Sequence, residues 1–329
     1  MPSERAASGA KVSEGRKVSK RERRAVIKGT KRRQTISIVG AGRLGTALAR
    51  ALHECGYEIE SVVARRRSHA RRAAELSGAR PLALTPAQLD RLPASDILII
   101  TTPDDAIAGA ATQIADATRG ASRGRTALHA SGALSSDALA ALRRRGFSTG
   151  SMHPLVAVSD PLSGAGSLRG AFYCLEGERQ AVSRARSLVG ALDGRSFSVR
   201  SQDKALYHAA AVMTAGHVVA LFDIATEMLT RCGLTERRAR TVLLPLLRST
   251  LENLSTLEPP GALTGTFARA DTTTVRRHLA ALRPQSLTEA RAAYALLGLR
   301  SLRLAERAGA GPAALKEIEE LLRAGEQKN

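Results

Sequence analysis

The sequence contains no tryptophan, and aromatic residues make up only 3% of its 329 positions. Hydrophobic residues nevertheless account for 43% of the chain, so the apolar core must be built mainly from Ala, Leu, Val and Ile. Such a core favours helices, because alanine and leucine have high helix propensity. The length is large for one compact domain and ordinary for two.

Cysteine is also scarce. The three cysteines, Cys55, Cys174 and Cys232, are far apart and odd in number, and no pair has the spacing of a zinc site. This pattern excludes a disulfide framework and a structural metal, and it indicates a protein of the reducing cytoplasm.

Long apolar runs are missing as well. No stretch reaches the roughly 18 uninterrupted apolar residues that a membrane span needs, and the N-terminus has no apolar stretch of the secretory kind. The most apolar helical stretch, residues 209–222, is short and contains His217. We therefore expect a cytoplasmic protein without a membrane partner.

The formal net charge of +20 is unevenly distributed. Residues 1–33 contain twelve Lys or Arg and three Glu, which leaves +11 for the rest of the chain. This segment has few apolar residues to offset the entropy of ordering it, so we expect a disordered basic tail. Nucleic-acid binding by the tail is a minor alternative, because such charge runs are usually solvated.

Residues 34–200 alternate short apolar runs with helical periods, which is typical of βαβ units and a parallel sheet. The predicted strands lie at 35–40, 59–64, 96–101, 126–130, 148–153, 172–175 and 197–199. The sequence therefore predicts an α/β, doubly wound Rossmann domain with a mostly parallel sheet.

Residues 201–325 contain no strand-like runs, and Ala/Leu-rich helical periods predominate. A long helix is predicted over 202–231, and a second over 235–253 with Pro245 kinking it. We expect an all-helical C-terminal domain. Its apolar faces exceed what one small bundle needs, which favours a homodimer formed through this domain.

A glycine motif follows the first predicted strand and opens a predicted amphipathic helix. The string GAGRLG matches G-x-G-x-x-G: Gly40 makes the turn, Gly42 admits a pyrophosphate, and Gly45 lets the helix pack closely. The free N–H groups of the helix would bind the phosphates. The alternative is a glycine turn without a ligand. The predicted cofactor residues are Gly40, Ala41, Gly42, Arg43, Leu44 and Gly45.

The cofactor type is indicated about twenty residues further on. An acidic residue at the end of the second strand would bind the ribose of NAD, but this chain has Ala64, followed by Arg65 and Arg66. Guanidinium groups suit a 2′-phosphate, so NADP is the predicted cofactor. A solvated arginine run is the alternative, and His69 nearby is interpreted as a surface residue.

Thr102 and Pro103 follow the central strand at its carboxyl edge, where open α/β sheets bind their ligands. We expect this loop to lie against the nicotinamide-ribose half of the cofactor. Capping of the next helix by Thr102 or Asp104 is an equally good interpretation, and the two are compatible.

Four strings in this order resemble a family of NADP oxidoreductases that join a Rossmann-like domain to a helical domain of unknown function. The resemblance covers roughly residues 34–325, and the family is similar to 6-phosphogluconate and 3-hydroxyisobutyrate dehydrogenases, pyrroline-5-carboxylate reductase and ketopantoate reductases. The strings are HASGALSS (129–136), SMHPL (151–155), DKALYHAAA (203–211) and ALTGTFARADTTTVRRHL (262–279).

The resemblance implies catalytic residues in these strings. Lys204 matches the general acid/base lysine of the related dehydrogenases, and His208, four residues later on the same helix face, stands where they have an amide. Ser131 resembles the start of their substrate-holding Ser-Gly-Gly. His129 and His153 end neighbouring strands and either orient the substrate or bind buried backbone groups, the second being favoured for His129.

The implied reaction is hydride transfer between NADPH and a small anionic carbonyl or imine compound, such as a 2-oxo acid of the ketopantoate type. Some positions depart from the family, as where relatives read HPLQTF and this chain reads HPLVAV at 153–158. These departures support one alternative, a non-catalytic NADP(H)-binding sensor.

Overall fold

The computed structural model describes residues 33–120 and 122–326, which divide into two compact units between Lys204 and Ala205. The division lies four residues beyond the predicted end of the Rossmann domain. The predicted basic tail, residues 1–33, lies outside the described residues except for Arg33.

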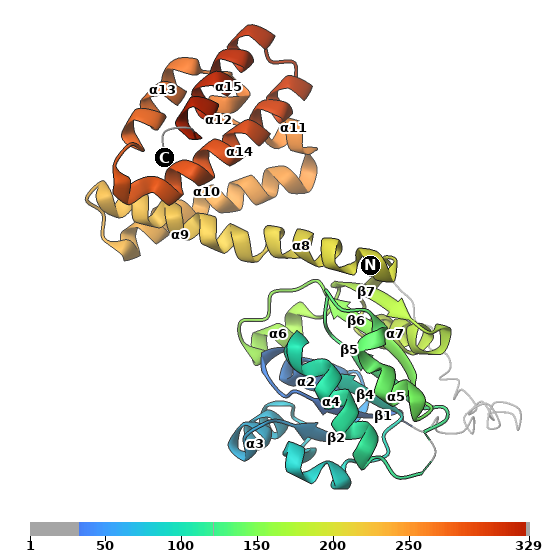
Figure 1. Ribbon diagram of the computed structural model, residues 1–329. Helices are drawn as coiled ribbons and strands as arrows, with labels where there is room; N and C mark the ends of the chain where they lie inside the picture. Colours follow the sequence, from blue (N-terminus) through green and yellow to red (C-terminus); the bar gives the residue numbers. More distant parts are fainter. Residues whose placement is uncertain (1–32, 121, 327–329) are drawn as a thin grey trace, which may run out of the picture. The chain divides into compact units, whose positions relative to one another are not determined.

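The N-terminal unit is built on one eight-stranded sheet with the order β3-β2-β1-β4-β5-β6-β7-β8 (Figure 1). Its strands are β1 (Thr35–Val39), β2 (Glu58–Val63), β3 (Leu82–Leu84), β4 (Ile97–Ile100), β5 (Thr126–His129), β6 (Ser148–Pro154), β7 (Phe172–Gly177) and β8 (Arg195–Phe197). The pairing of β6 with β7 is antiparallel, and all other pairs are parallel. This order continues the Rossmann order 3-2-1-4-5-6 and confirms the predicted fold class.

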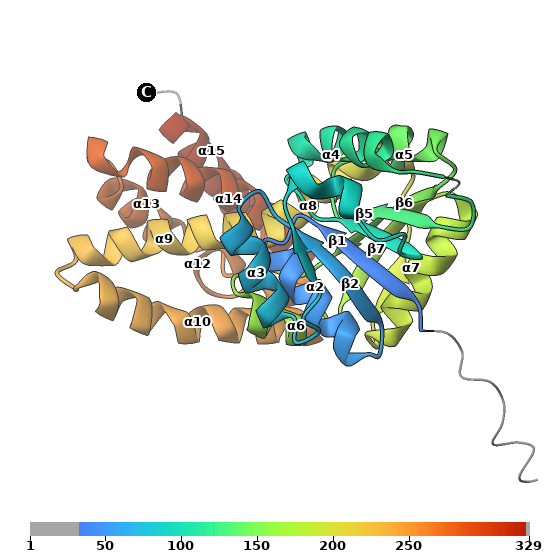
Figure 2. The ribbon, with the colours of Figure 1, turned by 90° about the horizontal axis from the view of Figure 1, so that it is seen from below.

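Helices cover both faces of this sheet (Figure 2). One face carries α2 (Arg43–Glu54), α3 (Arg67–Leu76), α6 (Pro161–Ser167) and α7 (Arg179–Ala191). The other carries α4 (Asp104–Ala117), α5 (Ala140–Arg144) and the 3₁₀ turns η1 (Pro86–Arg91) and η2 (Ser136–Leu139). A last 3₁₀ turn, η3 (Ser201–Asp203), leads to the end of the unit.

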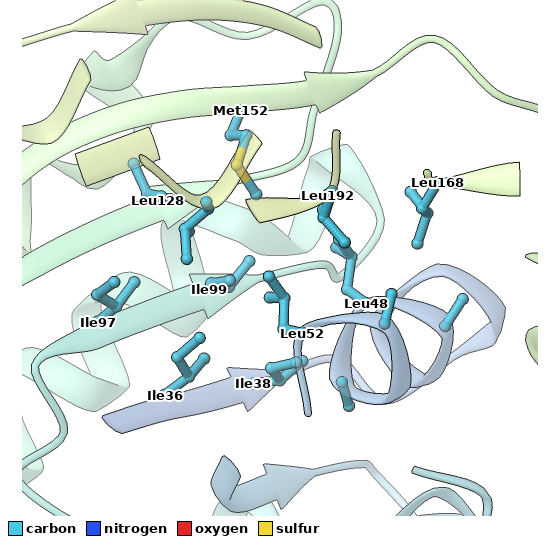
Figure 3. Close-up of a cluster of buried hydrophobic side chains, with 14 of the residues drawn as sticks. Ile36, Ile38, Leu48, Leu52, Ile97, Ile99, Leu128, Met152, Leu168 and Leu192 are labelled. Atoms are coloured by element: carbon cyan, nitrogen blue, oxygen red, sulfur yellow. The ribbon is translucent and has the colours of Figure 1, made fainter. Parts of the chain in front are cut away.

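Aliphatic side chains fill the space between the sheet and its helices, as the composition predicts. On the α2 face, the β1 residues Ile36 and Ile38 meet Leu48 and Leu52 of α2 (Figure 3). Every residue of β1 and β4 is buried, which explains why the sequence of β4 is a continuous apolar run. This packing fixes β1 in the middle of the sheet and the start of α2 against one face of it.

The N-terminal unit contains two short elements that the sequence does not predict. The strand β3 has only three residues, and α6 has seven, five of which are small. Neither is long enough to display a clear hydrophobic period. The last strand, β8, begins and ends two residues earlier than the predicted 197–199, since the pattern of alternation is weak at this exposed edge.

The C-terminal unit is helical throughout its described residues, as predicted (Figure 1). Its helices are α8 (Lys204–Thr214, with Lys204 counted in the first unit), α9 (Gly216–Arg231), α10 (Glu236–Thr256), α11 (Pro259–Ala262), α12 (Gly265–Ala268), α13 (Thr272–Ala281), α14 (Thr288–Arg307) and α15 (Pro312–Glu326), with the 3₁₀ turn η4 (Gln285–Leu287). Its buried core lies among α13, α14 and α15.

The first two helices of this unit correspond to the single helix predicted over 202–231. They are separated at Ala215, which precedes Gly216 and has φ −109° and ψ −73°, a distorted right-handed helical conformation. The next helix, α10, is longer than predicted and continues through Pro245 without ending there.

Many large apolar side chains on α8, α9 and α10 remain exposed. Leu206 is 76% exposed, Val219 70% and Leu246 64%. The helical stretch Ser201–Arg231 is long and apolar enough, by length and composition alone, to cross a membrane. It is more extensive than the stretch 209–222 that the sequence analysis considers. An apolar face of this size indicates a surface that something covers.

Candidate functional site

The glycine loop between β1 and α2 is held by the neighbouring strand β2. The backbone N–H groups of Gly40 and Ala41 both donate to the carbonyl oxygen of Val63 at 2.9 Å. Gly40 has φ +102°, a conformation that other residues rarely adopt. The chain therefore makes its tight turn at the first glycine of the motif, as the sequence predicts.

The three glycines of the motif have different surroundings. A Cβ atom on Gly40 would lie 2.5 Å from the backbone nitrogen of Thr102, and one on Gly45 would lie 2.5 Å from the carbonyl oxygen of Gly40. At Gly42 the only atom within reach is that same oxygen, at 4.0 Å. Gly40 and Gly45 are thus required for packing, whereas Gly42 leaves open space in front of the helix.

A pocket of about 800 Å³ lies over this loop, within the size range of small-molecule and cofactor sites. Its walls come from the ends of β1, β2 and β4, from η1 and from one face of α4. The lining residues are Val39, Gly40, Ala41, Gly42, Val63, Ala64, Arg65, His69, Pro86, Leu89, Thr101, Thr102, Pro103, Asp105, Ala106, Gly109, Ala110, Gln113 and Ile114.

Thr102 contributes a polar group to this pocket. Its hydroxyl oxygen is buried and has no hydrogen-bond partner in the described part of the chain. The following helix, α4, has Pro103 at its N-cap position and no side-chain cap, so the capping alternative for Thr102 is not realised. A buried hydroxyl without a partner is costly, and this one lies at the wall of the pocket, where a ligand could accept or donate a hydrogen bond.

The end of β2 contributes the basic part of the pocket. Ala64 and Arg65 line it, and so does His69, which the sequence analysis interprets as a surface residue. Arg66 does not line the pocket; it occupies the N-cap position of α3. Of the two predicted arginines, the structure therefore brings only Arg65 to the pocket wall.

Lys204 lies at the carboxyl ends of β5 and β6 with no exposed surface. Its Nζ atom donates to the hydroxyl of Ser151 at 2.7 Å and, more weakly, to the carbonyl oxygen of Ser131 at 3.4 Å. Burial lowers the pKa of this ammonium group, and the carboxylates of Glu176 and Asp104 act in the opposite direction. A lysine in such surroundings gives up a proton more readily than one in water.

The hydroxyl of Ser131 is engaged in its own loop. It donates to a carboxylate oxygen of Asp104 at 2.8 Å and accepts from the backbone N–H groups of Ala133 and Leu134. The side chain thus shapes the turn after β5 and connects it to the start of α4. The Ser131 hydroxyl therefore already has its hydrogen-bond partners within the protein and is not available to a substrate.

His129 has a structural role, the interpretation that the sequence analysis favours. Its Nδ1 atom accepts from the N–H of Ser131 at 3.2 Å, and its Nε2 atom lies 3.0 Å from the carbonyl oxygen of Ser135. These contacts require the neutral ring with the proton on Nε2. Burial lowers the pKa of His129 to about 4.

Glu176 on β7 is a buried carboxylate that the sequence analysis does not identify. It accepts hydrogen bonds from the N–H and hydroxyl groups of Ser136 and from the hydroxyl of Ser201. It therefore holds the turn after β5 and the segment before α8 in place near Lys204. No local motif distinguishes this glutamate, because its partners are distant in sequence.

The two remaining predicted catalytic residues are placed differently. His153 is half-buried near the end of β6, opposite Cys174 of β7. His208 lies one turn after Lys204 on α8 and belongs to the C-terminal unit. Among the described residues there is no cluster of His, Cys, Asp and Glu that could hold a metal ion.

Two family models match successive parts of the chain, and the second match begins within the N-terminal unit. Residues 21–154 match a Rossmann-like domain, and residues 171–301 match a domain of unknown function, DUF2520. No curated protein matches the sequence.

Solved structures share this fold at low sequence identity. A proposed NADP oxidoreductase from Bacteroides fragilis is 23% identical, with 82% of this chain and 98% of that one covered and a TM-score of 0.67. A protein from Thermotoga maritima is 22% identical, with 88% and 99% covered and a TM-score of 0.61. An imine reductase from Myxococcus stipitatus in complex with NADP⁺ is 17% identical, with 86% and 99% covered and a TM-score of 0.55.

Proposed function

We propose that this protein is an NADP-dependent oxidoreductase that acts on a small anionic carbonyl or imine compound. Its chain joins a Rossmann-like domain to the domain of unknown function DUF2520. The observation that carries the proposal is the pocket over Gly40–Gly42, at the carboxyl edge of the sheet where α/β folds bind dinucleotides. The imine reductase that shares the fold supports the choice of a C=N or C=O bond.

The residues present fit a nicotinamide dinucleotide. Gly42 leaves space for a pyrophosphate before the first turn of α2, and the buried hydroxyl of Thr102 lacks a partner that a ligand would supply. Arg65 is available for a 2′-phosphate, and Ala64 offers no carboxylate to the ribose hydroxyls of NAD. Bound NADPH would supply a hydride to the carbon of the substrate's double bond.

The proton for the product is assigned to Lys204. Burial lowers the pKa of Lys204, which makes its ammonium group a better proton donor, and its hydrogen bond to Ser151 fixes that group. Lys204 has no exposed surface, so its contact with a substrate is part of the proposal. His208, one turn later, is assigned a supporting role in orienting the substrate.

The experiment has two stages. Purified protein is titrated with NADP⁺ and with NAD⁺, and NADPH oxidation is then followed with a panel of 2-oxo acids and cyclic imines. We expect binding of NADP⁺ at least about tenfold tighter than of NAD⁺, a difference of about 1.4 kcal/mol, and turnover of at least one panel member. Absence of affinity for both dinucleotides would remove the proposal.

A second candidate function is a non-catalytic NADP(H) sensor. The burial of Lys204 and the engagement of the Ser131 hydroxyl with Asp104 favour it, because neither group is presented to a substrate. This candidate predicts tight NADP(H) binding without turnover on any panel member, so the same experiment separates the two.

We also propose that the exposed apolar side chains of α8, α9 and α10 pack against a second copy of the chain in a soluble homodimer. The support is the exposure of Leu206, Val219 and Leu246, which is unfavourable for a monomer in water. Soluble proteins that form obligate homodimers ordinarily bury apolar surfaces of this kind in the dimer interface.

A further inference from the structure

The pocket over the glycine loop has two walls of different chemistry. The wall made by η1 and α4 is apolar or small, with Pro86, Leu89, Gly109 and Ala110. The opposite wall, at the end of β2 and the start of α3, holds Arg65 and His69. A flat apolar group suits the first wall and an anionic group suits the second.

This division fixes the direction of a bound dinucleotide along the pocket. The pyrophosphate belongs at Gly42, where the surface is open in front of α2. The adenine ring then lies against the apolar wall, and the ribose that carries it passes the end of β2. A phosphate on the 2′-oxygen of that ribose is thereby directed toward Arg65 and His69.

The start of α3 adds positive potential at the same place. His69 is the third residue of this helix, whose N-cap residue Arg66 makes no side-chain cap and whose first turn contains no acidic residue. The first N–H groups of the helix therefore keep their partial positive charge. The side chains of Arg65, Arg66, Arg67 and His69 are all exposed.

The lining also contains one acidic residue. Asp105 lines the wall formed by α4 and is the only carboxylate among the lining residues. The titratable side chains of the lining are thus Arg65, His69 and Asp105. The two basic groups occur together on the β2–α3 side and the carboxylate lies on the other, so the basic side can take an anion without an acidic neighbour on its own wall.

We propose that His69 is the second basic group of a 2′-phosphate subsite, acting with Arg65, and that Arg66 is not part of it. This inference rests on the proposed function, since it concerns the same dinucleotide pocket. A phosphate monoester carries close to two negative charges at neutral pH and is held best by more than one positively charged donor. His69 would thus help to set the preference for NADP over NAD.

The test uses the full chain and two probes that differ only in the phosphate: adenosine 2′,5′-bisphosphate and adenosine 5′-monophosphate. Their dissociation constants are measured by calorimetry for the wild type, His69→Ala, His69→Lys and Arg66→Ala. We expect His69→Ala to weaken the bisphosphate by about tenfold and the monophosphate by less than twofold, the loss typical of one charge-assisted hydrogen bond. His69→Lys should restore the difference, and Arg66→Ala should leave it within about twofold, because Arg66 lies outside the pocket lining.

The outcomes separate this inference from the proposed function. If the wild type binds the bisphosphate tightly and His69→Ala binds it equally well, the role of His69 is refuted while the NADP site stands. A loss caused by Arg66→Ala in place of His69→Ala would likewise overturn the assignment. If the wild type binds neither probe nor NADP⁺, the proposed function fails and this inference fails with it. Thermal unfolding of each variant shows whether a loss of binding reflects loss of the fold.

Discussion

The ammonium group of Lys204 donates a hydrogen bond of 2.7 Å to the hydroxyl of Ser151, from the first residue of α8 to the sixth strand of the sheet. If Lys204 supplies the proton, Lys204→Met should lower kcat by about 10²–10⁴-fold, the usual contribution of a general acid, and leave the dissociation constant of NADP⁺ unchanged. Single-turnover kinetics with NADPH and calorimetry provide the two readouts.

Ser151→Ala is the matched control for that variant. It removes the acceptor and keeps the lysine, so we expect a smaller fall in kcat than for Lys204→Met. Equal turnover by the wild type and Lys204→Met would contradict the assigned role of Lys204, whereas binding of NADP⁺ without turnover by the wild type would favour the sensor.

Two glycines of the same motif should respond to alanine in opposite ways. In Gly45→Ala the new Cβ would meet the oxygen of Gly40 at 2.5 Å, so we expect a loss of about 1–3 kcal/mol in the free energy of unfolding. In Gly42→Ala the Cβ has space, and the free energy of unfolding should change by less than about 0.5 kcal/mol while NADP⁺ affinity falls. Denaturant titration and calorimetry measure both. A stable Gly45→Ala variant would show that the loop relaxes.

The arginines after β2 should differ in their effect on the cofactor. Arg65 lines the pocket and Arg66 does not, so Arg65→Ala should raise the Michaelis constant for NADPH far more than that for NADH. Arg66→Ala should change neither by more than about twofold, as expected for an exposed side chain without a direct contact. Equal effects of Arg65→Ala on the two cofactors would refute its contact with the 2′-phosphate.

Acid should destabilise the protein through His129. Its pKa falls from 6.5 in the unfolded chain to about 4 in the folded one, mainly because burial disfavours the charged ring. The unfolded state therefore takes up a proton first as the pH falls. The free energy of unfolding should therefore fall by about 3 kcal/mol as the pH falls from 6.5 to 4. Above pH 6.5 His129 should have no such effect.

His129→Asn removes the titrating group and serves as the comparison. Urea unfolding from pH 4 to pH 8 should give a shallower pH dependence for the variant over the window of His129. The variant is expected to be less stable at pH 8, because the contacts with Ser131 and Ser135 are altered. Parallel curves would show that His129 is not the group responsible.

A charge on the apolar face should break the proposed dimer. Val219→Glu and Leu246→Glu place carboxylates at positions that are 70% and 64% exposed in the single chain. We expect sedimentation to give a dimer for the wild type and monomers for both variants, because burial of an unpaired charge is unfavourable. Leu162→Glu, at an exposed leucine of the N-terminal unit, should remain a dimer. A monomeric wild type would overturn the proposal.

The sequence predicts the centre of the sheet better than its edges and its polar interior. The βαβ pattern and the glycine motif are strong local signals, so β1, α2 and β4 lie where they are expected. The pairing of Glu176 with Ser136 and Ser201 depends on residues 40 and 25 positions away, which no local pattern encodes. His69 is exposed, as interpreted from the sequence, but its place in the pocket lining depends on how η1 and α4 pack beside it.

The position of β1 between β2 and β4 has a consequence for synthesis of the chain. On one side Ile36 is paired with Ile59, but its other neighbour, Ile97, belongs to a strand made much later, and 61 positions separate Thr35 from its partner Asp96. At about 5–20 residues per second, a nascent chain keeps an apolar strand with one unpaired edge for roughly 3–12 s. During that interval the segment TISIV has an unpaired edge that chaperones can bind and that can take part in aggregation.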